Sequence, residues 1–275
     1  MRLQDKLKEL QNKPIALLAT NFYNFETLHG VLKAASIVKS PIILQLTRSS
    51  IDYMGLPVAY QMARAAIELQ GVEAWIHLDH GDSYELAAKC LEIGFDSVMI
   101  DGSEKPIEEN IAITRRVAEL AKKYNACVEA ELGYVAKLGQ STSKKGFTEP
   151  EEAELFVNQT GVDALAVAIG TSHGFYTHEP ELDLERLVQI HKATRAALVL
   201  HGGSGIPHQT LTEAISRGIC KINLATEIKN IFVKTLKGVL ENENEIDLRK
   251  VFPVATSAVT SLVIEKLKIV NGIQS

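Results

Sequence analysis

The chain has 275 residues, of which 46% are hydrophobic, and carries a formal net charge of −5 with a pI near 5.9. This length and composition suit one domain, residues 1–275, with a sizeable core. The mild acidity argues against nucleic acid, and against an anionic membrane surface, as the main partner. The first ten residues show an amphipathic helical pattern without the apolar run of a signal peptide. Three scattered cysteines fit a reducing compartment, so we expect a cytoplasmic protein.

Eight short apolar stretches recur along the chain, and each is typical of a buried parallel strand. The predicted strands are 14–21, 41–46, 73–80, 95–101, 126–132, 163–170, 197–202 and 219–224. Between most of them apolar residues recur three and four positions apart, as in amphipathic helices; examples are 25–39, 57–70, 106–124 and 182–195. Eight alternating units predict an α/β fold, a closed (β/α)8 TIM barrel. An open doubly wound sheet is the competing topology, although no GxGxxG follows the first strand.

Two regions do not follow the repeating unit. After the eighth strand, a helical pattern over 226–240 leads through a charged stretch, 241–250, to an apolar helix at 254–270. This extra C-terminal helix either caps the barrel or joins subunits. Residues 133–150 are rich in Gly, Ser and Lys, and a loop of this length is typical of a lid or a binding loop.

Three histidines come just after predicted strands. His80, His173 and His201 lie in WIHLDHG, LAVAIGTSHG and AALVLHGGSG. Barrels carry their chemistry at the carboxyl ends of the strands, so we expect the three imidazoles to converge on one rim. Catalytic zinc takes three protein ligands and leaves a position for substrate. The pattern therefore favours a catalytic metal site over three unrelated loop histidines.

Further polar groups follow the same strands. Asp79 directly precedes His80, where a carboxylate can either transfer a proton or orient an imidazole. The glycine-rich stretch 201–207 exposes backbone N–H groups before a helix, and Thr226 in NLATE can cap the next helix. In barrels, the loops after strands seven and eight often bind phosphate, although ordinary turns have the same composition. A metal beside a phosphate site predicts carbon–carbon bond chemistry next to the carbonyl of a phosphorylated ketone, through an enediolate.

These motifs resemble those of class II, metal-dependent ketose-bisphosphate aldolases over nearly the whole chain. The matching segments are 20-TNFYNFET-27, 77-HLDHG-81, 99-MIDGS-103, 129-EAELG-133, 168-AIGTSHG-174, 201-HGGSG-205 and 221-KINLATE-227. The short form NLAT is closer to the tagatose-bisphosphate aldolase branch than to the larger fructose-bisphosphate enzymes. The resemblance implies a zinc-dependent barrel, a homodimer or homotetramer. It also implies reversible cleavage of a ketose bisphosphate into dihydroxyacetone phosphate and an aldehyde.

The resemblance also implies roles for individual residues. The three histidines match the catalytic zinc ligands, and Asp79 matches the general acid/base on the aldehyde side. Asp101 and Glu131 fall where some members place a second or alternative metal position. The residues expected to bind the sugar phosphate are Asn21, Gly174, Gly202, Gly203, Ser204, Asn223, Ala225 and Thr226. A monovalent cation, Na⁺ or K⁺, often lies near the phosphate.

One segment departs from the family pattern. The family continues EAELG into a stretch ending in adjacent acids, one of which transfers a proton at the ketone carbon. Here Leu138 and Gly139 occupy these positions, and three lysines lie within 137–145. A basic loop would suit an acidic aldehyde. Two alternatives therefore stay open: a non-standard ketose whose aldehyde half is acidic, with or without a phosphate on dihydroxyacetone, and a catalytically lapsed barrel that binds sugar phosphate.

Two other enzyme classes compete with this interpretation. A class I aldolase needs a desolvated lysine inside the barrel, and Lys221, which alternates with Asn223, is the best candidate. That lysine does not explain three histidines at the rim. Metal-dependent hydrolases on this barrel commonly carry His-x-His on the first strand, which here ends in Thr20 and Asn21.

Overall fold

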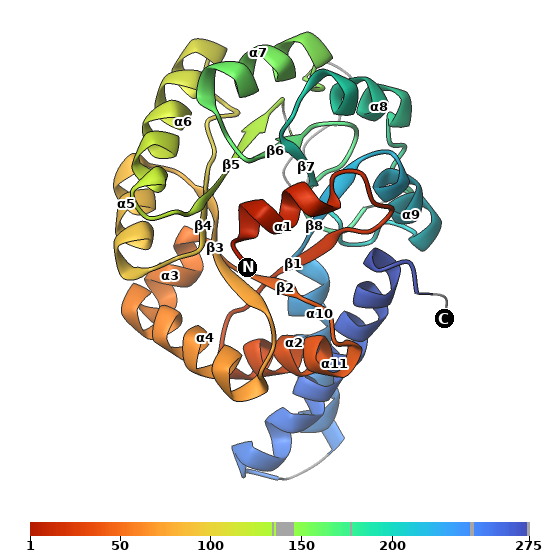
Figure 1. Ribbon diagram of the computed structural model, residues 1–275. Coiled ribbons are helices and arrows are strands. Elements are labelled where there is room, and N and C mark those ends of the chain that lie inside the picture. Colours follow the sequence, from red (N-terminus) through yellow and green to blue (C-terminus); the bar gives the residue numbers. More distant parts are fainter. Residues whose placement is uncertain (134, 136–145, 177, 243–244, 274–275) are drawn as a thin grey trace.

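The computed structural model describes residues 1–133, 135, 146–176, 178–242 and 245–273. Its strands pair in parallel, in chain order, and close into a barrel (Figure 1). They are β1 (Leu17–Asn21), β2 (Ile42–Leu46), β3 (Ala74–Gly81), β4 (Ser97–Ile100), β5 (Cys127–Leu132), β6 (Ala164–Val167), β7 (Ala197–Leu200) and β8 (Ile219–Leu224). The predicted TIM barrel is confirmed, and the open doubly wound sheet is excluded.

Helices form the layer outside the sheet (Figure 1). Those that follow β1 to β7 are α2 (Phe25–Val38), α3 (Arg48–Met54), α4 (Leu56–Gln70), α5 (Tyr84–Ile93), α6 (Ile107–Lys122), α7 (Pro150–Thr160), α8 (Leu184–Ala193) and α9 (His208–Ser216). The four helices that the apolar spacing placed at 25–39, 57–70, 106–124 and 182–195 are confirmed as α2, α4, α6 and α8 to within about two residues, the usual scatter of helix ends. No helix in the described part of the chain combines the length and the apolar character that a membrane crossing needs.

The C-terminal helices differ from the prediction in where they begin. The last helix, α11 (Leu248–Val270), starts six residues before the predicted position at 254, because the Asp247 side chain accepts a hydrogen bond from Arg249 N–H and caps an earlier turn. Pro253 then lies inside the helix, which costs one backbone hydrogen bond. Thr226 is the first residue of α10 (Thr226–Asn242) rather than its cap.

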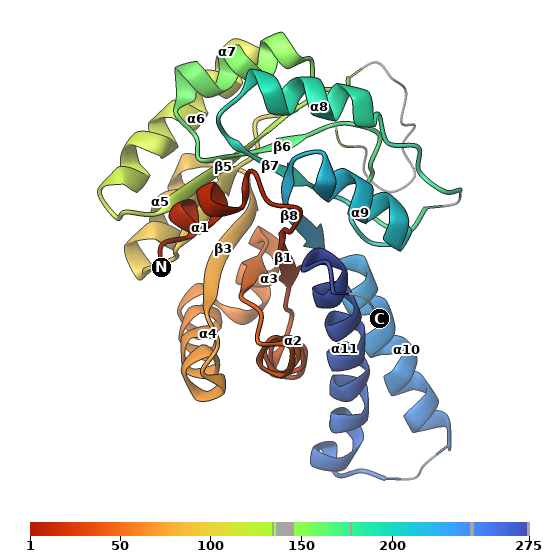
Figure 2. The same ribbon diagram turned by 45° about the vertical axis from the view of Figure 1, so that its right-hand side comes forward.

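The C-terminal helix lies outside the barrel and does not cap it. In Figure 2, α10 and α11 run side by side next to α2. The Thr260 hydroxyl donates to the Gly30 carbonyl of α2 at 3.1 Å, and Ala16 N–H donates to the Val270 carbonyl at 2.9 Å. The end of the chain is thus fixed to the entry of β1.

Strand β3 shows how the sequence builds the barrel interior. Successive side chains of a strand point to opposite faces. Ile76 and Leu78 pack in the outer cluster with the helices, whereas Trp75 belongs to the inner cluster. The inward side chains change along the strand from Trp75, through His77, to Asp79. The interior is therefore apolar at the amino end and polar at the carboxyl end.

The predicted N-terminal helix closes the amino end of the barrel. In α1 (Leu3–Leu10), Leu3, Leu7 and Leu10 are buried in the inner cluster. The indole N–H of Trp75 donates to the Met1 carbonyl at 3.0 Å and fixes the start of the chain there. Figure 1 shows α1 lying across this end of the strands.

Candidate functional site

The structure brings His80, His173 and His201 together at the carboxyl end of the barrel. Their ring centroids lie 4.8 to 5.9 Å apart. One nitrogen from each ring lies within 4.8 Å of the others, a spacing at which a single metal ion could take all three. The predicted convergence of the imidazoles is present, and their role as ligands stays a prediction.

An irregular end to β3 allows Asp79 and His80 to face the same site. In a regular strand, neighbouring side chains point in opposite directions. His80 instead adopts a left-handed backbone with φ of 49°, and the pairing with β4 shifts register between Leu78 and Gly81. Gly81 is needed here, because a Cβ atom would lie 2.4 Å from the Met99 carbonyl oxygen. Backbone strain of this kind is typical of functional sites.

The loop that carries His173 is fixed to the loop after β7. The Tyr176 hydroxyl accepts a hydrogen bond from Ser172 N–H at 2.9 Å and donates to the Gly202 carbonyl at 2.8 Å. Gly202 has φ of 70°, and a Cβ atom there would lie 2.3 Å from the Ser172 carbonyl oxygen. Close backbone contact thus holds the His173 loop near the glycine-rich turn after β7. The sequence patterns did not point to Tyr176.

Hydrogen bonds leave two imidazole nitrogens facing each other. His80 Nδ1 bonds to Asp101 Oδ2 at 2.8 Å, and His201 Nε2 bonds to Glu129 Oε1 at 2.9 Å. The opposite ring atoms, His80 Nε2 and His201 Nδ1, lie 3.1 Å apart. Ligating histidines usually donate their second N–H to a carboxylate in this manner. The donor set therefore fits a metal ion between the rings.

The charge of the cluster also favours a cation. Four carboxyl groups converge here, those of Asp79, Asp101, Glu129 and Glu131; among the described residues, the Lys221 ammonium and the protonated His80 ring face them. Glu131 Oε2 is buried without a hydrogen-bond partner among the described residues, and it lies 3.7 Å from His201 Nδ1. Burial and the nearby Asp101 raise the pKa of Glu131 to about 8. Together with His80 and Asp101 it forms a second group of donors within 4.8 Å, where an alternative metal position was predicted.

The three imidazoles differ in their protonation. Burial opposes charge on His80, but Asp79 and Asp101 outweigh it and raise its pKa to about 10. Burial, together with the neighbouring rings, lowers the pKa of His173 to about 3, and burial lowers that of His201. The cluster thus holds a proton on His80 where a bound metal would supply the positive charge.

Asp79 is a buried carboxylate held by three amides. Asn21 Nδ2 donates to Oδ2 at 2.9 Å, and Gln45 Nε2 and Asn223 Nδ2 approach Oδ1 at 3.3 and 3.4 Å. Burial raises the pKa of this carboxyl, but His80 and His201 outweigh that effect, so it lies below its usual value. Oδ1 of the ionised Asp79 carboxylate lies 4.0 Å from His80 Nε2, beside the histidine cluster.

A cavity of about 230 Å³ opens next to Asp79, His80 and His173. Of the predicted phosphate-site residues, it is lined by Asn21, Gly174, Gly202, Ser204, Asn223, Ala225 and Thr226. Gly203 is not on its wall, and its N–H donates to the Asn223 carbonyl at 3.0 Å. Sequence reasoning missed four further lining residues, namely Tyr23, Thr47, Ser49 and Lys229. The one sequence feature that could have identified them is their position, since each follows the end of β1, β2 or β8 by a few residues.

Leu138 and Gly139, and the three lysines of 137–145, lie outside the described residues. The predicted basic lid, and the loss of the usual acids, therefore stay predictions.

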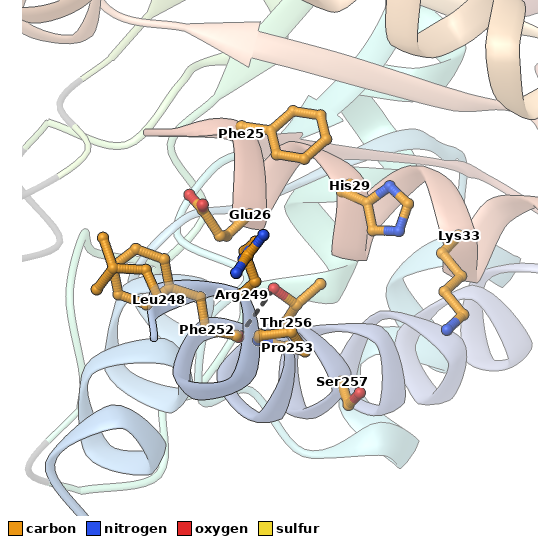
Figure 3. A pocket seen from close by; sticks show the side chains of 10 residues that line it. All are labelled: Phe25, Glu26, His29, Lys33, Leu248, Arg249, Phe252, Pro253, Thr256 and Ser257. Atoms are coloured by element: carbon orange, nitrogen blue, oxygen red, sulfur yellow. Dashed lines mark hydrogen bonds between the residues drawn. The ribbon is translucent and has the colours of Figure 1, made fainter. Parts of the chain in front are cut away.

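A second hollow, of about 430 Å³, lies between α2 and α11, and none of His80, His173 and His201 lines it. Figure 3 shows Phe25 and His29 on the α2 side and Phe252 and Thr256 on the α11 side. The Thr256 hydroxyl bonds to the Phe252 carbonyl of its own helix at 3.1 Å. This wall is largely apolar and lacks the converging donors of the barrel rim.

The chain is similar to known proteins over nearly its whole length. The profile of the family described as "Fructose-bisphosphate aldolase class-II" matches residues 1–274. The YdjI aldolase from Escherichia coli K12 is 32% identical and superposes with a TM-score of 0.88, over 97% of this chain and 96% of that one. A protein from Coccidioides immitis, provisionally assigned as a fructose-1,6-biphosphate aldolase, is 28% identical with a TM-score of 0.88, over 98% and 96% of the two chains. The fold is shared with a fructose-bisphosphate aldolase from Campylobacter jejuni, at 21% identity and a TM-score of 0.84, over 98% and 93%.

Proposed function

This chain belongs to the class II fructose-bisphosphate aldolase family and is an aldolase, and on that premise we propose a divalent-metal mechanism. The substrate is a ketose phosphate, cleaved reversibly into dihydroxyacetone phosphate and an aldehyde. The observation that carries the proposal is the convergence of three imidazoles beside an ionised, amide-held Asp79.

His80, His173 and His201 are the proposed ligands of one zinc ion. Neutral imidazole nitrogen is a preferred zinc ligand, and three such ligands leave a position for substrate. When bound, the ion would polarise the substrate carbonyl and stabilise the negative charge that develops beside it. The chain's own part is to hold the rings, which Asp101 and Glu129 do through the opposite nitrogens of His80 and His201.

Asp79 is the proposed general acid/base for the aldehyde half. In cleavage, its carboxylate takes the proton from the hydroxyl on the carbon that becomes the aldehyde. The carbon–carbon bond then breaks, the aldehyde carbonyl forms, and the electron pair stays on the ketone half. Asn21 and Gln45 fix the carboxylate for this transfer. The ketone carbon must then take up a proton to give dihydroxyacetone phosphate. Where the family carries its usual donor for this step, the chain has Leu138 and Gly139, which lie outside the described residues.

The phosphate of the ketone half is proposed to lie against the turns after β7 and β8. Gly202 and Ser204 come from the first turn, and Ala225 and Thr226 from the second. Thr226 begins α10, and the positive end of the helix dipole there favours an anion. Since the same cavity wall includes His173 and Asp79, a phosphate held there would place the ketone next to both groups.

The structure argues against the class I alternative. Lys221 Nζ is buried and lies 2.6 Å from Glu129 Oε2, and Lys221 is not among the residues that line the cavity. A Schiff base needs a lysine amine that substrate can reach.

Zinc-loaded protein incubated with dihydroxyacetone phosphate, or with dihydroxyacetone, and a panel of neutral and acidic aldehydes tests the proposal. We expect carbon–carbon bond formation that a chelator abolishes and zinc restores. We also expect metal-dependent exchange of deuterium into dihydroxyacetone phosphate. Trapping by borohydride would establish a Schiff base instead, and binding without exchange would indicate the lapsed barrel.

Other features belong to the same proposal. They are the affinity for tagatose-type substrates, a monovalent cation near the phosphate, a homodimer or homotetramer, and a place in the cytoplasm. The first three stay predictions from the family resemblance, and the last stays a prediction from the cysteine content and the absence of a signal-peptide pattern.

A further inference from the structure

Glu129, which holds His201 in the function proposed above, forms an ion pair inside the barrel with Lys221, which has no role in that proposal. Lys221 and Glu129 have exposed fractions of 0% and 2%, and 2.6 Å separates Nζ from Oε2. Neither residue lines the cavity beside Asp79. Moving two ions out of water is costly, and a buried ion pair is often no more stabilising than apolar side chains of the same volume. Stability alone therefore does not account for the pair.

The carboxylate of Glu129 divides its oxygens between two partners. Oε2 accepts from Lys221, whereas Oε1 lies 2.9 Å from His201 Nε2. The far nitrogen of the same ring, His201 Nδ1, lies 3.1 Å from His80 Nε2. A continuous chain of contacts thus runs from the ammonium of Lys221 to the centre of the histidine cluster.

The contact with Glu129 fixes which nitrogen of His201 carries the proton. An ionised carboxylate only accepts hydrogen bonds, so Nε2 must be protonated. The neutral ring then has its lone pair on Nδ1, directed at the other histidines. Asn223 Nδ2 lies 3.1 Å from the same Nε2, but an amide N–H cannot bond to another N–H, and Glu129 is both closer and charged.

The charge that balances Glu129 comes from Lys221 rather than from the third neighbour, His77. His77 Nδ1 bonds to Ser97 Oγ at 2.8 Å, while His77 Nε2 stays 3.8 Å from Glu129 Oε2. Burial and the charge of Lys221 lower the pKa of His77 to about 3, so this ring is neutral. Lys221 is consequently the group that keeps Glu129 ionised in the barrel interior.

We propose that Lys221 and Glu129 act as a positioning pair: Glu129 holds His201 with Nδ1 free for the metal, and Lys221 fixes the orientation and charge of Glu129. The inference rests on the proposed function in one respect, that His201 is a metal ligand. Neither member of the pair touches substrate in this account.

The double variant Glu129→Gln with Lys221→Met tests the pair. It removes both charges and so avoids leaving one buried ion unpaired, which would endanger folding. We expect the affinity for Zn²⁺ and Co²⁺, measured by chelator competition, to fall about 10- to 100-fold, as for other partners of metal ligands. We also expect the visible absorption spectrum of the Co²⁺ form to change, which a merely structural role would not cause.

Arg64→Met is the matched control. It breaks another ion pair, in which Arg64 Nη2 lies 2.7 Å from Asp96 Oδ2 and both side chains are partly buried. Asp96 directly precedes β4, so this pair lies at the amino end of the barrel. This variant should lose thermal stability and keep the wild-type metal affinity and Co²⁺ spectrum.

A measurement on the wild-type chain does not depend on how the double variant folds. In metal-free protein labelled with ¹⁵N-histidine, the His201 resonances, identified by their loss in His201→Gln, should show Nε2 protonated. Protonation at Nδ1 would overturn the inference, as would a folded double variant with unchanged metal affinity and spectrum. A wild-type protein that binds neither metal would remove the proposed metal function itself, and the inference with it.

Discussion

The two ends of this barrel are built from the same strands and have opposite chemistry. At the amino end, Ile43 and Trp75 of β2 and β3 pack against Leu7 of α1 in a closed apolar cluster. Further along the same two strands, Gln45 and Asp79 lie buried and hydrogen-bonded to each other. In barrels, the amino end serves stability and the carboxyl end serves chemistry. Here the change occurs within a few residues of each strand.

The difference shows how a polar site can be kept inside a barrel. Each fully buried apolar side chain contributes about 1.5–3 kcal/mol, whereas burying an ion costs several kcal/mol unless it is paired. The site pairs its ions, as Glu129 does with Lys221 and Asp101 with His80. Burial of apolar side chains at the amino end offsets the remaining free-energy cost of burying these ions. Changes at one end should therefore affect chemistry, and changes at the other should affect stability.

The largest effect is expected for His173→Ala at the rim. Loss of one ligand should remove zinc and lower activity by more than about 100-fold, since even the partners of ligands account for 10- to 100-fold. Thermal unfolding of the metal-free variant should stay near wild type, because the side chain is partly exposed in a loop. Metal analysis, a retro-aldol assay and calorimetry check this. Full activity with full zinc content would refute the ligand assignment.

Asp79→Ala should separate proton transfer from metal binding. We expect kcat to fall by about 10²–10⁴-fold, the usual contribution of a general acid/base. Zinc content should be retained, because the three imidazoles remain. Steady-state kinetics with parallel metal analysis measure both. If zinc were lost together with activity, Asp79 would be a metal-site residue and the proposed division of roles would be wrong.

Leu7→Ala tests the amino end. Leu7 has an exposed fraction of 1%, so its truncation should cost about 2–5 kcal/mol of unfolding free energy. Denaturant titration measures this loss, and kcat per folded molecule should not change. Leu69→Ala on α4, where the side chain is 78% exposed, is the control and should shift stability by less than about 0.5 kcal/mol. A comparable loss of kcat in Leu7→Ala would show that the two ends are coupled.

The smallest predicted effect is a pH dependence of metal binding. The pKa of His80 lies near 10 in the metal-free protein, so the ring is protonated at neutral pH. That proton must leave before the nitrogen can bind a metal, so affinity should rise about tenfold per pH unit as pH increases through neutrality. Calorimetry in buffers of different ionisation enthalpy should detect the released proton. Binding that weakens as pH rises would contradict this description of His80.

The sequence was sufficient to predict the barrel and the converging histidines because both depend on local patterns. Apolar runs of strand length locate the strands, and a polar residue at the end of a parallel strand must reach the common rim. His80, His173 and His201 follow this rule, and so does Asp79. Their convergence could therefore be predicted without knowing the order of strands around the barrel.

Contacts between strands that are distant along the chain are harder to predict from the sequence. Glu129 lies in the EAELG motif, but its contact with Lys221 joins β5 to β8 across the interior, and no spacing along the chain shows this. Tyr176 lies in an irregular loop. The left-handed backbone of His80 is likewise invisible in the sequence, because period-two alternation would point Asp79 and His80 apart.

X-ray absorption spectroscopy on the zinc-loaded protein tests most directly whether three imidazoles coordinate one divalent ion at the carboxyl end of the barrel. We predict a single class of zinc site with three nitrogen ligands of imidazole type, and loss of this signal in His173→Ala. A spectrum without imidazole scattering, or one unchanged by that substitution, would contradict it.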